Sequence, residues 1–96
     1  MGFISWKQNI APNGANLSPA YAEAVDPSGN KYSVDKWVLL VGGWWADTVG
    51  GAQSYINTTS NTWYVKLWSP SIRNPPGDNY VNILAIPKEY FQKVYN

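Results

Sequence analysis

The chain contains neither cysteine nor histidine among its 96 residues. Without cysteine there is no disulfide framework and no thiolate nucleophile. Without histidine the chain lacks the commonest metal ligand and the usual general base near neutral pH. Composition therefore excludes Ser-His-Asp and Cys-His catalysis and histidine-based metal sites. We expect no catalytic residues, no metal and no cofactor.

Charge is scarce as well. Charged residues make up 14% of the chain, whereas a soluble domain typically has about 25%. The seven basic residues are spread singly and the net charge is +1, so no polybasic patch for nucleic acid can be identified. Depletion of charge is typical of surfaces that contact other molecules.

Long apolar runs are absent too. The longest, Trp37–Val41, has five residues, whereas a membrane-spanning helix needs about 20. Residues 1–9 lack the basic region and the apolar region of a signal peptide. We therefore expect a soluble protein with no signal peptide and no membrane insertion.

Aromatic residues are abundant, at 16% of the chain, and tryptophan and tyrosine supply most of them. The length is that of a single domain. We predict one β domain over residues 1–96, in which residues 1–10 form either a first strand or an arm that packs on a neighbour. Segments rich in Asn, Gly, Ser and Pro predict loops or turns, which are 11–19, 47–52, 57–61 and 69–79.

The densest apolar segment, Trp37–Ala46, predicts the central strand of the domain. Both faces of residues 37–41 are apolar, which predicts cover on both sides, by a second sheet or by a partner subunit. Gly42-Gly43 predicts a bulge or a sharp bend. The adjacent Trp44 and Trp45 should then face opposite ways.

The other predicted strands are short and lie between turn signals. They comprise a hairpin over 20–35 around the turn 26–30, and strands at 53–56, 62–68 and 80–86. In the amphipathic segment 62–68, Trp63, Val65 and Leu67 should face inward. Residues 88–95 predict a short C-terminal helix against the sheet. We predict an all-β fold, a single small antiparallel β-sandwich or barrel of about six or seven strands.

Carboxylates offer one enzymatic alternative. A glycosidase needs two of them about 5–9.5 Å apart, and Asp35 and Asp47, which flank the predicted central strand, are the one pair of the six acidic residues worth naming. Asp26 and Asp78 lie in turn contexts, where bonding to nearby backbone explains them. We expect the protein not to be an enzyme.

The aromatic residues are the stronger functional signal, because exposed Trp and Tyr faces can stack on sugar rings while neighbouring amides bond the hydroxyls. Tyr64 and Trp68 lie on the outward face of the segment 62–68. The candidate ligand-binding residues are Tyr64, Trp68, Trp44, Trp45, Tyr55 and, in the proline-rich loop, Arg73. The alternative for each aromatic residue is a place in the core or in a subunit interface.

A short chain without Cys or His, with many Asn, Gly, Ser and Thr turns and with the Trp-rich segments 37–45 and 62–68, resembles small bacteriophage virion proteins. The resemblance is to tail-tip, fibre-knob and other host-contact β domains. It implies a virion protein that forms a homo-oligomer, often a trimer in such fibres, and that contacts other virion proteins and a cell-surface glycan or receptor. A stand-alone carbohydrate-binding module is the alternative.

Overall fold

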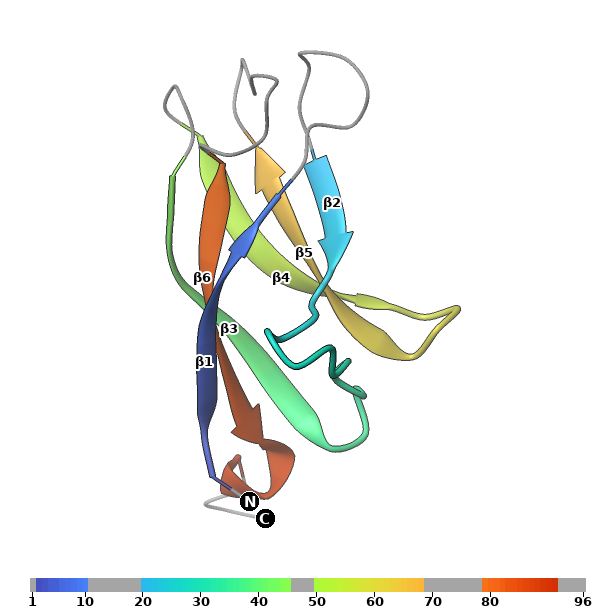
Figure 1. Cartoon of the computed structure of the whole chain (residues 1–96). Helices are drawn as coiled ribbons and strands as arrows, with labels where there is room; N and C mark the ends of the chain where they lie inside the picture. The colour runs from blue at the N-terminus through green and yellow to red at the C-terminus, as the bar shows by residue number, and fades with distance from the viewer. Residues whose placement is uncertain (1, 11–19, 46–49, 69–78, 92–96) are drawn as a thin grey trace.

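The computed structural model describes residues 2–10, 20–45, 50–68 and 79–91 (Figure 1). These residues form six strands and one 3₁₀ turn, which are β1 (Ile4–Asn9), β2 (Ala20–Glu23), β3 (Trp37–Trp45), β4 (Gly51–Asn57), β5 (Thr62–Trp68), β6 (Tyr80–Pro87) and η2 (Lys88–Tyr90). The strands make two three-stranded antiparallel sheets, which we call the first sheet (β1-β6-β3) and the second sheet (β2-β5-β4). The predicted all-β, sandwich-like antiparallel fold is confirmed.

The middle of the first sheet is β6, which pairs with both β1 and β3. Its Val81, Ile83 and Ala85 alternate along the strand and are buried on the inner face. The prediction that the segment around 37–41 is the central strand is wrong, because β3 lies at an edge of the sheet. Apolar density alone does not place a strand, since pairing depends on partners distant in sequence.

The two faces of β3 differ in burial. Trp37 and Leu39 are buried, whereas Leu40 on the opposite face is 43% exposed. Within the described chain the second sheet covers the inner face, which confirms one half of the predicted cover, while cover of the outer face by a partner subunit stays a prediction. The expected irregularity is confirmed by a register shift between Val41 and Gly43, with Gly43 as the first residue back in register.

The two adjacent tryptophans point to opposite faces, as predicted, and the bulge determines which of them faces inward. Trp44 pairs with the buried Val81 and packs against the core, whereas Trp45 pairs with Tyr80 and is half-exposed. Trp44 thus belongs to the inner face of the first sheet, and Trp45 belongs to its outer face.

The second sheet is built on the β4–β5 hairpin, whose turn extends to the right in Figure 1. The Asn57 side-chain oxygen accepts hydrogen bonds from the amides of Thr59 and Ser60, and Asn61 adopts a positive φ of 57°. This confirms the predicted turn between two strands. Strand β4 begins at Gly51, which lies inside the segment 47–52 that the sequence predicted to be a loop.

The predicted hairpin over 20–35 is wrong in its pairing. β2 pairs with β5 along its whole length, while the following segment keeps only an isolated bridge between Val25 and Lys31. The Trp63 backbone explains the difference, because its carbonyl accepts from Ala24 and its amide donates to Tyr32. The turn 26–30 therefore joins two segments that both bond to β5.

Tyr32 lies at the centre of the core. Its ring stacks on Trp6 at 5.1 Å between centroids and meets Trp37 edge-on at 4.9 Å. Its hydroxyl donates to Oδ2 of Asp26 at 2.7 Å. Burial, and then the Asp26 carboxylate, raise the pKa of Tyr32, so the hydroxyl stays protonated at neutral pH.

Two side chains join the sheets through β3 carbonyls. Trp63 Nε1 donates to the carbonyl of Trp37 at 2.8 Å, and Ser54 Oγ donates to that of Leu39 at 2.7 Å. Val65 and Leu67 are fully buried beside Trp63, which confirms the predicted inward face of 62–68. The core therefore lies between the two sheets, and their other faces point outward.

Asp26 makes the fold sensitive to acid. Its carboxylate accepts from the Tyr32 hydroxyl and from the amides of Ser28 and Asn30, and these bonds, that of Tyr32 foremost, lower the pKa of Asp26. Its stabilising effect is thus full above the unfolded pKa of about 3.9 and lost as pH falls through the lower folded value. We expect Asp26→Asn to lower the urea midpoint at pH 7 and to differ less from the wild type below pH 3.

The matched control for that comparison is Asp35→Asn, which removes an exposed carboxylate bonded to one Asn61 amide at 3.0 Å. A wild-type advantage over Asp26→Asn that is equally large at pH 7 and pH 2.5 would contradict this account of Asp26.

The C-terminal part differs from its prediction. Residues 88–90 form a 3₁₀ turn with no buried residue, and Tyr90 and Phe91 are exposed. The expected helix against the sheet is therefore wrong for this part, because Tyr90 meets the exposed Phe3 edge-on at 5.2 Å instead of the core. The rest of 88–95 lies outside the described residues, as do 11–19, 46–49 and 69–78.

No helix in the described ranges has the length and apolar character needed to cross a membrane.

Candidate binding face

The outer face of the second sheet carries four aromatic side chains together with an amide, a carboxylate, an ammonium group and a glycine, and we call it the aromatic face. Strand alternation and cross-strand register place its members, which are Tyr21 and Glu23 on β2, Tyr64, Lys66 and Trp68 on β5, and Gly51, Gln53 and Tyr55 on β4. Lys66 stands between Tyr21 and Gln53, and Tyr64 stands between Glu23 and Tyr55. The face therefore has tyrosines toward its middle and a tryptophan at one end.

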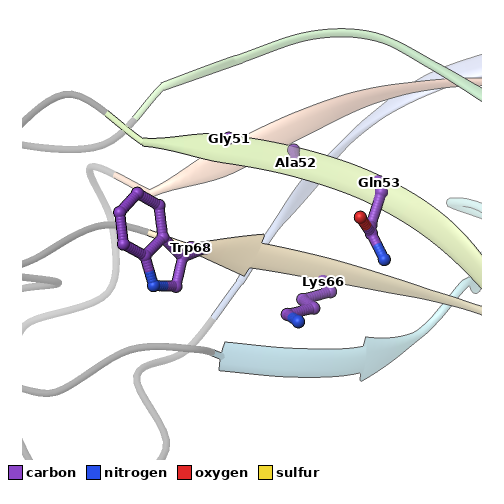
Figure 2. Close-up of a pocket in the computed structure, with 5 residues that line it drawn as sticks. All are labelled: Gly51, Ala52, Gln53, Lys66 and Trp68. Carbon is purple, nitrogen blue, oxygen red and sulfur yellow. The ribbon is translucent and has the colours of Figure 1, made fainter.

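Trp68 at the end of β5 borders a hollow of about 280 Å³. Its side chain is 48% exposed. Its cross-strand partner is Gly51, which has no side chain to fill the space beside the indole. The hollow is lined by Gly51, Ala52, Gln53, Lys66 and Trp68. Figure 2 shows Gln53 reaching from β4 toward β5, with Lys66 and Trp68 along β5.

Gly51 keeps this hollow open although its backbone does not require glycine. A Cβ atom built on Gly51 meets no other atom within 4 Å. Gly51 also lacks a positive φ, which among the described glycines belongs to Gly29. An L-residue would therefore be accepted at position 51, and its side chain would project beside Trp68.

Three tyrosines form a cluster on the aromatic face. The ring of Tyr55 lies 5.8 Å from that of Tyr64 and 6.0 Å from that of Tyr21. Burial, and then the two neighbouring tyrosines, raise the pKa of Tyr55. Its hydroxyl is therefore protonated at neutral pH and can both donate and accept a hydrogen bond.

Glu23 is held by partners within the chain. Its carboxylate accepts from Thr62 Oγ1 at 2.7 Å and lies 3.2 Å from Lys31 Nζ. The Thr62 hydrogen bond, followed by the interactions with Lys31, lowers the pKa of Glu23 against the opposing effect of burial. Glu23 is thus an ionised structural group, and its pKa is shifted away from that of a general acid.

The described residues contain no group of three or more acidic side chains that could hold a metal ion. Of the carboxylate pair considered from the sequence, Asp35 is exposed and bonded to Asn61, and Asp47 lies outside the described residues. Chemically, the aromatic face offers stacking surfaces, amide and hydroxyl hydrogen bonds, and one ammonium group.

The structure brings three of the predicted candidates together. Tyr55, Tyr64 and Trp68 share the aromatic face, whereas Trp44 packs against the core and Trp45 lies on the outer face of the first sheet. Arg73 lies outside the described residues.

Five members of the face were not among the candidates from the sequence, namely Tyr21, Glu23, Gly51, Gln53 and Lys66. The alternation of a strand places Tyr21 and Glu23 on one side, but finding their partners requires the register of β2 with β5. No known protein family, curated protein or solved structure matches the chain. The fold and the face define a small all-β protein with an aromatic outer face that carries few charges.

Proposed function

We propose that the protein is a non-enzymatic saccharide-binding protein that uses the aromatic face. The observation that carries this proposal is the half-exposed indole of Trp68 beside a hollow that Gly51 leaves open. An indole offers a flat apolar surface for the C–H face of a sugar ring. The Gln53 amide, on the wall of the hollow, can both donate to and accept from sugar hydroxyls.

The tyrosine cluster extends the proposed site along β5. Tyr64 is four residues from Trp68, which is roughly 13 Å along a strand, and Tyr55 packs beside it. A monosaccharide bound at Trp68 would not reach the rings of Tyr64 and Tyr55. The spacing therefore favours an oligosaccharide that contacts the indole with one residue and the tyrosines with another.

The hollow can be tested by filling it. We expect Gly51→Thr to abolish measurable oligosaccharide binding, because the new side chain occupies the space beside Trp68, and to leave the thermal midpoint unchanged or raised, because Thr suits a strand better than Gly. Calorimetric titration and thermal unfolding measure the two effects.

Ser5→Thr, which enlarges an exposed strand residue of the other sheet, is the control. Full affinity retained by Gly51→Thr would contradict the assignment of the hollow.

Self-association through the outer face of the first sheet is a second candidate function. Leu40 is exposed there and pairs with Leu84, while Val38 pairs with Ile86 in the next row. The outward-facing residues of these three strands include a single charged residue, Lys7. Its ammonium group lies 5.0 Å from the centroid of the Tyr80 ring. An apolar outer face of this kind favours contact with another copy.

Homo-oligomerisation through this face would leave the aromatic face available to a glycan. That arrangement fits the host-contact domains that the sequence resembles, for which a trimer is the implied form. A place in a virion, with other virion proteins as partners, is proposed on that resemblance.

Leu40→Glu is expected to convert the oligomer to a monomer at micromolar concentration, because it places a charge in an apolar contact. Sedimentation velocity measures the change. Ile56→Glu, at a residue of the other sheet with 44% exposure against 43% for Leu40, should leave the oligomer intact. A monomeric wild-type protein would overturn the self-association proposal.

A further inference from the structure

The cation at the hollow has no counter-charge within the described chain. The Lys66 ammonium lies 5.9 Å from the Tyr21 ring centroid, and no carboxylate among the described residues pairs with it. Glu23, the acidic member of the aromatic face, is engaged by Lys31 and Thr62. The one ion pair among the described residues joins Lys31 and Glu23. The charge of Lys66 therefore stays available at the wall of the hollow.

Three different kinds of group line this small space. Trp68 supplies an apolar face, Gln53 supplies an amide, and Lys66 supplies a positive charge (Figure 2). A ligand that satisfies all three has a ring with a C–H face, neutral hydrogen-bonding groups and one anionic substituent. A neutral sugar would leave the Lys66 charge unanswered.

We propose that the hollow selects an acidic saccharide residue, whose carboxylate or sulfate pairs with the Lys66 ammonium while its ring stacks on Trp68. This inference rests on the proposed saccharide-binding function and specifies its ligand. The anion belongs at the Trp68 end of the ligand, because the carboxylate of Glu23 flanks Tyr64 in the tyrosine cluster and disfavours a second anion there.

The test uses three sets of soluble hexasaccharides. These are uronate-containing chains, the same chains with their carboxyl groups reduced to alcohols, and neutral chains that carry sulfate groups. Affinities are measured by calorimetry at low and at physiological salt for the full-length wild type, Lys66→Gln and Lys36→Gln. Lys36 is an exposed lysine outside the aromatic face, so its variant matches the charge change.

We expect the wild type to bind an acidic set about tenfold more tightly than the reduced set, as a charge-assisted hydrogen bond allows. The preference should weaken with added salt. Lys66→Gln should lose the preference while keeping its affinity for the reduced chains, and Lys36→Gln should keep both. The uronate and sulfate arms show which anion the hollow prefers.

Equal binding of acidic and reduced chains by the wild type would overturn the inference and leave the saccharide-binding proposal intact. Retention of the preference by Lys66→Gln would likewise overturn the assignment to Lys66. Absence of binding to all three sets would overturn the saccharide-binding proposal together with the inference.

Discussion

Trp68→Ala is expected to lower the affinity for a bound oligosaccharide by a factor of about 5 to 150. The indole is the one aromatic group among the residues that line the hollow, and its removal takes away the stacking platform together with one wall. Loss of an aromatic stacking partner costs about 1–3 kcal/mol in comparable ring-stacking sites, which corresponds to a factor of about 5 to 150. Calorimetry is the appropriate measurement, because the other five tryptophans complicate fluorescence.

Trp45→Ala is the matched control for this variant. Trp45 is 50% exposed against 48% for Trp68, and it lies at the end of a strand on the outer face of the other sheet. Both variants remove the same side chain from a half-exposed position, and because Trp45 lies on the face proposed for self-association, the comparison rests on saccharide affinity per folded protomer. Equal affinities of the two variants would contradict the role given to Trp68.

The second large effect concerns the core. We expect Tyr32→Ala to lower the free energy of unfolding by about 3–5 kcal/mol, as for other buried aromatic truncations. The ring is buried between Trp6 and Trp37, and its loss leaves both without their main partner and leaves Asp26 without the hydroxyl donor. Because domains are stable by only about 5–15 kcal/mol, this change is expected to bring the protein near its unfolding threshold.

Urea denaturation of Tyr32→Ala, Tyr32→Phe and Tyr21→Ala measures this effect. Tyr32→Phe keeps the ring and should cost the smaller amount expected for one hydrogen bond to a charged group, about 1.5–3 kcal/mol. Tyr21→Ala truncates a half-exposed tyrosine and should cost less than Tyr32→Ala. Similar losses from the two alanine variants would show that Tyr32 is not the centre of the core.

The burial of individual strands was readable from the sequence because one buried face leaves a period of two. Val65 and Leu67 in β5, and Val81 and Ile83 in β6, follow this pattern and are all buried. The bulge before Trp44 was also predictable, since two adjacent glycines in a strand favour such a break.

Pairing between strands was not readable in the same way. The segment after Glu23 looked like half of a hairpin because the turn 26–30 is strong, yet β2 found its partner in β5, about forty residues away in the chain. Such long-range choices depend on which faces must be buried together. In this chain Tyr32 turned into the core instead of continuing a ladder with β2.

The candidate site was predictable where it depends on spacing within one strand, and not where it depends on the pairing of strands. Tyr64 and Trp68 could be placed on one outward face from their spacing, whereas Trp44 and Trp45 could not be assigned to the first sheet before the topology was known. Gly51 carries no side chain, so its contribution, the space beside Trp68, appears only when β4 is aligned with β5.

The most direct test of the saccharide-binding account is a calorimetric titration of wild-type protein and Gly51→Thr with the oligosaccharide that an array of neutral, uronate-containing and sulfated chains identifies. We expect saturable binding by the wild type and none by a Gly51→Thr protein that remains folded. An array on which the wild type binds no chain, or a folded Gly51→Thr protein that binds as tightly as the wild type, would contradict it.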